Sequence, residues 1–222
     1  MKILTWNVER FKSHKIEIKE LIESFNADII VLTETSSEID LNNNYNCVAT
    51  VELPSNHDGI YYEEAENRTT IWTKYEIVKQ NKTFDNFTSI CSKIKSEFGV
   101  LNIYATIIGV FGGKGERFKN DLEQHLDDFQ KLNIKETNCI IGDLNTTFSG
   151  FTYPSHDARY TLNETFESLK MKNLTAEISN NVDHIILSEA FLESKIIETQ
   201  ILNLDKKLSD HIGICIAIKN KS

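Results

Sequence analysis

Hydrophobic positions along the first part of the chain follow two different periods, which predict strands and a helix. Residues 2–8 alternate and then run apolar, as a buried strand does, and residues 27–33 form a fully apolar run that ends at Glu34. Residues 13–25 lie between them and carry apolar side chains at helical spacing, beginning at Ser13, a residue type favoured at helix caps. A helix between two buried strands is typical of a β–α–β unit.

The rest of the chain predicts many strands and few helices. Two further amphipathic segments, residues 116–132 and 160–169, are predicted to be helices. The other strand-like runs are residues 45–52, 69–75, 88–95, 100–108, 138–141, 182–187, 196–202 and 212–218. This order predicts an α/β fold in which two mixed β-sheets pack face to face with flanking helices, a four-layer α/β sandwich. No linker rich in Pro, Gly or Ser interrupts it, so we expect one domain over residues 1–222.

The composition is that of a globular protein, with 40% hydrophobic and 26% charged residues. No apolar run approaches the roughly 20 residues of a membrane-spanning helix, and the start of the chain lacks the charged and apolar regions of a signal peptide. The 4 cysteines lie far apart and form no C-x-x-C pair, which favours free thiols in a reducing compartment. We therefore expect a cytoplasmic protein that does not bind membranes.

The formal net charge of −9 limits the ways in which the protein could bind nucleic acid. A protein that coats nucleic acid through phosphate contacts alone should be basic. The negative charge argues against such coating. It does not exclude an enzyme whose acidic site holds cations and whose rim carries local Lys and Arg side chains.

Isolated polar side chains stand at the ends of the predicted strands. Strand ends carry Asn7, Glu34, Asp143 with Asn145, Asp183 with His184, and Asp210 with His211, while Tyr104 lies inside the 100–108 strand. Each has an ordinary explanation when taken alone, because Asn and Asp are common in turns and exposed charges are solvated. If neighbouring strands bring them together, however, so many carboxylates at one edge would be costly without a cation or a ligand.

Five short motifs that contain these residues resemble those of the endonuclease/exonuclease/phosphatase superfamily of the deoxyribonuclease I type. In chain order they are LTWNV, VLTET, IGDLN, VDHIILS and LSDHIGI. The sequence departs from the family pattern at Thr33, where Gln is usual, and at Leu144, where Phe is usual. Both departures leave the polar atoms of the motifs in place. No single motif is specific, but five in order span essentially the whole chain.

The resemblance implies a phosphoester hydrolase that uses Mg²⁺ or Mn²⁺. The implied metal-binding residues are Glu34, Asn7, Asp210 and Glu9, and the implied catalytic residues are His211, Asp183, Asp143, Asn145 and Tyr104. In this scheme Asp143 orients or deprotonates the attacking water, His211 stabilises the charge on the phosphate, and Asp183 holds the His211 ring. Two assignments have an equally simple alternative, since Glu9 could be a surface charge and Tyr104 a buried strand residue.

The substrate is less well defined by the sequence. Arg10, Arg68, Lys114 and Arg117 are predicted to contact substrate, and the glycine-rich segment 109–119 is either a phosphate-binding nest at a helix start or a flexible turn. Our main hypothesis is a nuclease that acts on DNA. The alternatives are a phosphatase or phosphodiesterase for a small-molecule or lipid phosphate and, ranked last, a non-catalytic binding module, because the full polar set is present.

Overall fold

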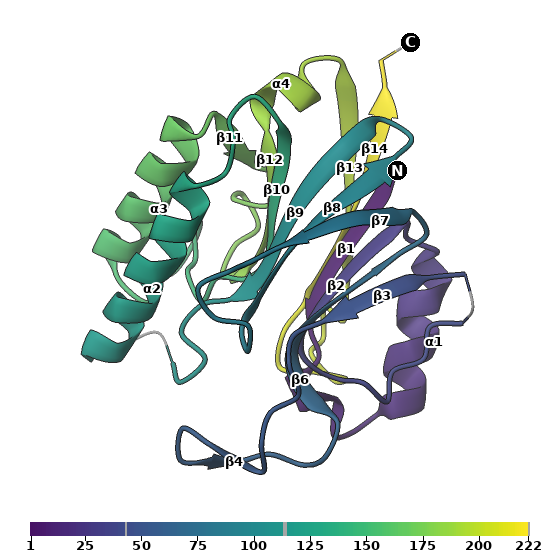
Figure 1. The fold of residues 1–222 in the computed structure, drawn as a ribbon, viewed down its shortest axis with the longest axis vertical. Coiled ribbons are helices and arrows are strands. Elements are labelled where there is room, and N and C mark those ends of the chain that lie inside the picture. Colours follow the sequence, from purple (N-terminus) through teal and green to yellow (C-terminus); the bar gives the residue numbers. More distant parts are fainter. Residues whose placement is uncertain (43, 113–114, 222) are drawn as a thin grey trace.

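Two six-stranded β-sheets form the centre of the structure, a computed structural model that describes residues 1–42, 44–112 and 115–221. The first sheet contains, in spatial order, β13 (Lys195–Leu202), β14 (Gly213–Asn220), β1 (Lys2–Asn7), β2 (Ile29–Ser36), β6 (Glu66–Thr73) and β3 (Asn46–Ala49). The second contains β11 (Met171–Asn173), β12 (Asp183–Ser188), β10 (Thr137–Asp143), β9 (Gly99–Ile107), β8 (Ser89–Ser96) and β7 (Glu76–Asn81). Strands β4 (Asn56–His57) and β5 (Ile60–Tyr61) form a separate hairpin, at the bottom of Figure 1.

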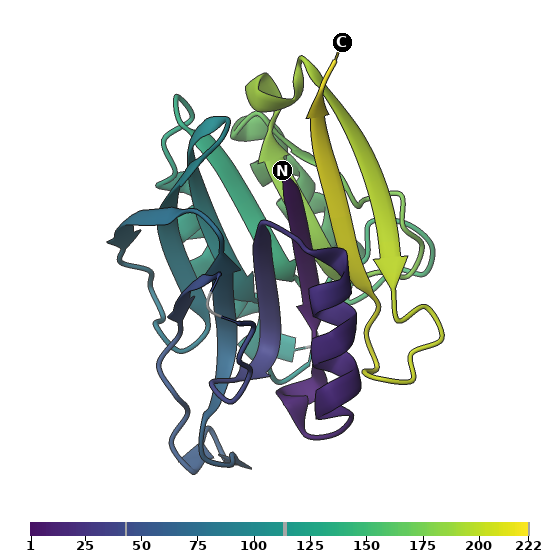
Figure 2. The same ribbon diagram turned by 90° about the vertical axis from the view of Figure 1, so that its right-hand side faces the viewer.

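Helices cover the outer faces of both sheets, which gives the four layers visible in Figure 1. Helix α1 (Lys15–Phe25) covers the first sheet, as the view in Figure 2 shows, and α2 (Gly115–Gln130) and α3 (His156–Ser168) cover the second. A 3-10 turn, η1 (Glu9–Phe11), and the short helix α4 (Glu189–Leu192) complete the elements. None of the helices in the described part of the chain has the length and apolar character needed to cross a membrane.

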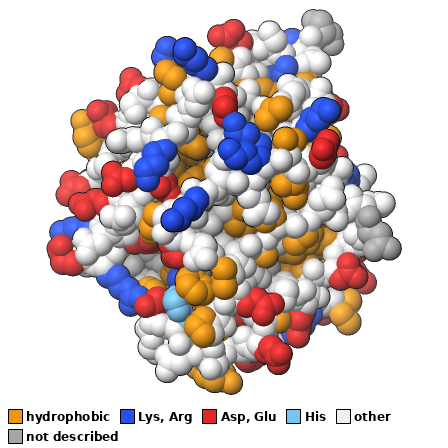
Figure 3. Space-filling view, viewed as in Figure 1, with side chains coloured by type: hydrophobic (Ala, Val, Ile, Leu, Met, Phe, Trp, Pro, Cys, Tyr) orange, Lys and Arg blue, Asp and Glu red, His pale blue; other side chains and the backbone are white. Residues whose placement is uncertain are grey.

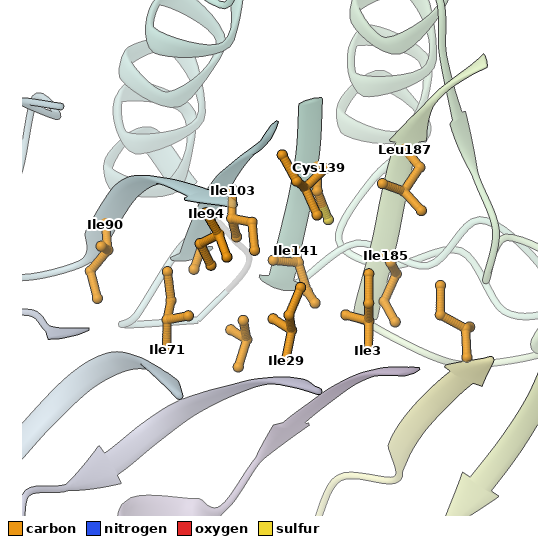
Figure 4. Close-up of a cluster of buried hydrophobic side chains, with 14 of the residues drawn as sticks. Ile3, Ile29, Ile71, Ile90, Ile94, Ile103, Cys139, Ile141, Ile185 and Leu187 are labelled. Atoms are coloured by element: carbon orange, nitrogen blue, oxygen red, sulfur yellow. The ribbon is translucent and has the colours of Figure 1, made fainter. Parts of the chain in front are cut away.

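The main core lies between the two sheets and is built largely from isoleucine. Figure 4 shows the two inner faces meeting through Ile3, Ile29 and Ile71 on one side and Ile94, Ile103, Cys139, Ile141, Ile185 and Leu187 on the other. Along β1, Ile3 points into this core while Leu4 and Trp6 pack under α1, because successive side chains of a strand point to opposite faces. Burial on both faces explains the nearly continuous apolar runs that predicted these strands.

The strand directions bring several strand ends to one edge of the sandwich. Strands β1 and β2 run parallel, as do β9 and β10, so their carboxyl ends lie together in pairs. Strand β12 runs antiparallel to β10 and begins where β10 ends, with Asp183 opposite Asp143. Strand β14 likewise begins beside the end of β1, where Thr5 pairs with Ile214. Strand β1 packs against β10 and β12, so both sets of ends meet at this edge.

The structure confirms the predicted fold class and most of the predicted elements. The sequence pattern did not predict the edge strand β7, the three-residue β11, the hairpin β4–β5 or α4. Strand β7 is mostly exposed, so it lacks the apolar signal of a buried strand. Ser13 does not cap α1, because His14 precedes the helix and makes no capping contact; Ser155 caps α3 by accepting a bond from the Ala158 amide.

Candidate active site

His211 and Asp183 form a buried pair at the shared edge of the two sheets. Nδ1 of His211 lies 2.7 Å from Oδ2 of Asp183, and their side chains are 17% and 1% exposed. Burial disfavours the charged imidazolium, but the Asp183 carboxylate and its hydrogen bond outweigh that effect and raise the pKa of His211 to about 10. His211 is therefore a cation at neutral pH, and its Nε2–H remains available to a negatively charged ligand. Sequence reasoning had predicted this pairing.

Asp143 lies at the end of β10 and is fully enclosed by polar neighbours. Its Oδ2 accepts a hydrogen bond from Nδ2 of Asn7 at 3.0 Å, and its Oδ1 accepts one from the Asn145 amide at 2.9 Å. Burial raises the pKa of Asp143 to about 7, although the charge of His211 opposes the rise. A carboxylate with a pKa near neutrality can accept a proton from water under physiological conditions.

Gly142 explains why a glycine precedes this aspartate. Its φ is +132°, and a Cβ added there would overlap the carbonyl oxygen of Thr106 on the neighbouring strand β9. Only glycine allows the two strands to approach this closely with that backbone conformation. The close approach fixes the end of β10 and so fixes the position of Asp143.

Glu34 lies near the end of β2 and is joined to Asp143 through Asn7. Nδ2 of Asn7 donates to Oε1 of Glu34 at 3.2 Å as well as to Asp143, while Oδ1 of the same side chain accepts from the Glu9 backbone amide at 2.9 Å. Glu34 has φ +43°, an uncommon conformation for a residue other than glycine. Burial raises the pKa of Glu34, and the Asn7 hydrogen bond and the charge of His211 oppose the rise. Asn7 thus bridges the two carboxylates, and its role as a metal ligand stays a prediction.

The other two predicted metal ligands, Glu9 and Asp210, lie at the rim. Oε2 of Glu9 accepts from the Asp210 amide at 3.2 Å, and Oδ1 of Asp210 lies 3.8 Å from Nε2 of His211. Within the described residues no three His, Cys, Asp or Glu side chains converge as a metal cage. The partly buried carboxylate of Glu34, which has no cationic hydrogen-bond partner among the described residues, fits an ion that keeps most of its water and takes one or two carboxylates, as Mg²⁺ does.

The chain matches the model of the endonuclease/exonuclease/phosphatase family over residues 4–211. It belongs to this family. The family consists of hydrolytic nucleases and phosphatases and is generally dependent on divalent metals. The match begins within β1 and ends at His211, so it includes Asn7, Glu34, Asp143, Asp183 and His211.

Solved structures share the fold of this endonuclease/exonuclease/phosphatase protein at low identity. An AP endonuclease from Archaeoglobus fulgidus superposes with a TM-score of 0.73 and 14% identity, over 99% of each chain. The endonuclease domain of a telomere-specific non-LTR retrotransposon gives 0.71 and 15%, over 100% of this chain and 99% of that one. A 3′ phosphatase from Neisseria bound to a product DNA hairpin gives 0.67 and 13%, over 99% of each. No curated protein sequence matches significantly.

Two residues that sequence reasoning missed hold the His211 loop in place. Nδ2 of Asn203 donates to the carbonyl oxygens of Ser209 and His211 at 2.8 and 2.7 Å. The Ser209 hydroxyl donates to the Asn7 carbonyl at 2.6 Å and accepts from the His211 amide at 3.2 Å. Ser209 stands in the LSDHIGI motif, which could have suggested it. Asn203 lies outside every motif, and no sequence signal marks it.

The structure does not place Tyr104, one of the implied catalytic residues, at the site. Its side chain is buried beneath α2, its hydroxyl donates to Oδ2 of Asp128 at 2.9 Å, and its ring packs edge-on against Phe129. Strand alternation turns Tyr104 toward the helices, on the opposite face from the core between the sheets. His184 is also buried away from the site: Nε2 contacts the Thr146 carbonyl at 2.9 Å, and burial lowers the pKa of His184 to about 4.

The predicted substrate-binding cations have different environments. Arg10 is paired with Glu66, which lies 2.5 Å from its Nε, and its guanidinium stacks on Tyr62. Arg68 is buried, and its Nε has no hydrogen-bond partner among the residues described. Arg117 is 55% exposed and lies 3.1 Å from Asp58. Lys114 lies outside the described residues, as does part of the predicted phosphate nest.

Cavities open on both sides of the buried carboxylates. On the His211 side, a hollow of about 600 Å³ is lined by Asn145, Asp183 and His211 together with Phe151 and Lys206. On the Glu34 side, a smaller cavity of about 100 Å³ is lined by Glu34, Arg10, Tyr62, Arg68 and others. The site is therefore open at both ends, with cationic side chains at each.

Proposed function

We propose that this protein is a divalent-metal-dependent phosphodiester hydrolase and that it acts as a nuclease on DNA. The observation that carries the proposal is the facing pair of groups at the sheet edge, a cationic His211 held by Asp183 and the enclosed carboxylate of Asp143. Phosphoester hydrolysis requires both a group that stabilises negative charge and a group that accepts a proton from water.

The protein groups divide this work between them. The imidazolium of His211 binds a phosphate oxygen and stabilises the charge that develops on it, which requires the protonated state that Asp183 maintains. Asp143 orients the attacking water and accepts its proton, and Asn145, whose amide Nδ2 lies 3.5 Å from Oδ2 of Asp143, positions a second phosphate oxygen. Asn7 keeps Asp143 and Glu34 at a fixed separation.

Glu34 is the residue that we expect to hold the metal, with Asn7, Asp210 and Glu9 as nearby oxygen donors. A bound Mg²⁺ or Mn²⁺ would neutralise charge on the phosphate. The ion would also relieve the cost of the partly buried Glu34 carboxylate, which has only the Asn7 amide as a hydrogen-bond donor among the residues described. The few protein ligands favour an ion that retains its waters.

The two-sided shape of the site favours a polymeric substrate over a small one. A small phosphate ester would need a single closed pocket, whereas here the hollow beside His211 and the cavity beside Glu34 continue the site in two directions. Exposed Phe151 and cationic Lys206 in the larger hollow suit a base and a backbone phosphate. Basic and acidic side chains are interspersed on the face shown in Figure 3, which suits local contact rather than coating.

Incubation of the purified protein with supercoiled plasmid and with labelled single-stranded DNA tests the proposal. We expect cleavage with Mg²⁺ or Mn²⁺, none with EDTA, and a loss of about 10²- to 10⁴-fold in His211→Gln. His156→Gln, which alters an exposed histidine on α3, is the matched control and should keep wild-type activity. Absence of metal-dependent cleavage of both DNA substrates would contradict the proposal.

A second candidate, a phosphatase for a small-molecule or lipid phosphate, is favoured by the net charge of −9. Release of inorganic phosphate from nucleotides and inositol phosphates distinguishes the two, since a strict nuclease releases none. Phosphate release from these compounds together with inactivity on DNA would establish the second candidate instead.

A further inference from the structure

Two arginines that flank one phenylalanine form a cationic pair beside the active site. The guanidinium carbon of Arg117, in the first turn of α2, lies 3.5 Å from the centre of the Phe111 ring, and that of Arg68, on β6, lies 5.3 Å from it. The Arg68 side chain is only 4% exposed. Its Nε has no hydrogen-bond partner among the described residues, and Nη2 makes a long contact of 3.4 Å with the Tyr62 hydroxyl. A buried guanidinium with so few partners requires an anion.

Asp58 supplies part of that missing negative charge. It lies between β4 and β5, and its Oδ2 is 3.1 Å from Nη2 of Arg117 and 3.7 Å from Nη2 of Arg68. The same oxygen lies 3.3 Å from Nε2 of His57. The Asp58 side chain is 38% exposed, and exposed ion pairs of this kind contribute little to stability. One carboxylate oxygen therefore lies between two guanidiniums, closer to that of Arg117 than to that of Arg68.

The cavity around this pair has the size of a single small anion. Its volume is about 140 Å³, and Asp58, Arg68, Phe111 and Arg117 line it. Asp85 and Asp121 line it as well, but their carboxylates accept hydrogen bonds from Thr88 and from the Gly109 amide. A water molecule takes up about 30 Å³ of the liquid and drug-sized ligands need about 300 Å³ or more, so a phosphate group fits and a nucleoside does not. Arginine pairs bind phosphate oxygens in this shared manner.

The cavity adjoins the catalytic centre through Arg68. On the antiparallel strands β2 and β6, the pairs Thr33–Thr69 and Thr35–Asn67 flank Glu34 and Arg68, so these two residues lie opposite each other. Both also line the cavity on the Glu34 side. A phosphate bound between Arg68 and Arg117 would thus belong to the same nucleic-acid strand as the phosphate cleaved beside Glu34 and would be its neighbour.

We propose that Asp58 is an internal substitute for this neighbouring phosphate, and that the β4–β5 hairpin must release Arg68 and Arg117 before a nucleic-acid strand occupies the site. This inference rests on the proposed nuclease function for the identity of the strand. The competition between Asp58 and phosphate is a property of the anion site and does not depend on catalysis. Asp58 weakens substrate binding and favours chains long enough to supply a second phosphate.

Titration with inorganic phosphate, in EDTA, tests the competition without any enzymatic activity. All variants carry His211→Gln, which removes the other cationic anion site, and binding is followed by isothermal titration and by ¹⁵N chemical shifts of the arginine Nε–H groups. We expect Asp58→Asn to bind phosphate about two- to fivefold more tightly, the range of an exposed ion pair. Glu63→Gln is the matched control, because it removes one negative charge from the same region, 3.8 Å from Lys12, without contacting either arginine.

Adding Arg117→Gln to Asp58→Asn should abolish the gain, and circular dichroism verifies that each variant is folded. The proposal is overturned if Asp58→Asn binds phosphate no more tightly than Glu63→Gln, or if the gain survives Arg117→Gln. It is also overturned if no variant binds phosphate at concentrations up to about 50 mM. In the active protein, Asp58→Asn should lower the KM for a DNA oligonucleotide by the same two- to fivefold and leave the KM of a dinucleotide, which has one phosphate, unaffected. Tighter phosphate binding without DNA cleavage would overturn only the nuclease function.

Discussion

Asp183→Asn tests the central electrostatic feature of the site. The substitution keeps the size of the side chain and removes the charge that lies 2.7 Å from Nδ1 of His211. The difference between the ordinary histidine pKa of 6.5 and the value of about 10 corresponds to roughly 5 kcal/mol in favour of the imidazolium. Burial opposes this charge, so without Asp183 we expect the pKa of His211 to fall to about 6.5 or below.

The pH profile of kcat/KM should therefore change shape as well as height. The wild-type protein needs Asp143 ionised and His211 protonated, so its activity should rise as the pH passes about 7 and fall as it passes about 10. In Asp183→Asn, about a tenth or less of His211 is protonated at pH 7.5. Loss of the imidazolium removes a charge that favours ionised Asp143, and loss of the Asp183 carboxylate removes one that disfavours it, so the lower pKa of His211 is what leaves few molecules with both groups in the required state. We expect a maximum about 10²-fold lower and no plateau.

Cleavage of a fluorescent oligonucleotide between pH 5.5 and 10.5 measures the profile, and NMR titration of His211 without metal measures the pKa directly. Asp157→Asn, an exposed change in the first turn of α3, is the control for an altered net charge. The reasoning is refuted if Asp183→Asn keeps a wild-type plateau with a rate within threefold, or if His211 still titrates above pH 9 in that variant.

Three further substitutions probe the surroundings of the site. Asp143→Asn should abolish cleavage yet raise the melting temperature of the metal-free protein by a few degrees at pH 8 and by less at pH 5. The pKa of Asp143 is about 7 in the folded protein against an ordinary value of 3.8, so the ionised carboxylate opposes folding above pH 7. An equal or lower melting temperature at pH 8 would contradict this. Gly142→Ala should cost about 2–4 kcal/mol in urea unfolding, because its Cβ would meet the Thr106 carbonyl, and a cost below about 1 kcal/mol would contradict the close approach. Tyr104→Phe should cost about 1 kcal/mol through the lost bond to Asp128 and keep activity within twofold; a tenfold loss would restore Tyr104 to the site.

Strand ends were predictable from the sequence because burial on both faces leaves a continuous apolar signal. The runs that contain Ile29–Ser36 and Thr137–Asp143 stop at polar residues, and those residues do lie at the shared edge. The same continuous apolar pattern does not predict the position of Tyr104, because a strand buried on both faces gives no indication of which face a side chain points to.

The supporting residues were not predictable because their partners are distant in sequence. Asn203 acts through backbone groups of the His211 loop, and Glu66 reaches the site through Arg10, which lies 56 residues away. Asp58 lies in a hairpin of two-residue strands with no apolar period, and its contact with Arg117 requires this hairpin to meet the start of α2. Local patterns carry no information about such pairings until the sheet order is known.

The net charge of −9 and a polyanionic substrate are compatible because the cations of the site are arranged in pairs with carboxylates. Arg10 is neutralised by Glu66 and Arg117 by Asp58, so the cleft presents less positive charge to solvent than its arginines suggest. A phosphate that enters must displace an acidic partner, whereas His211 is held cationic by a carboxylate that stays in place. In the proposed nuclease, this arrangement would keep binding weak along the nucleic-acid strand and concentrate charge stabilisation at the phosphate that is cleaved, a division that favours turnover over retention.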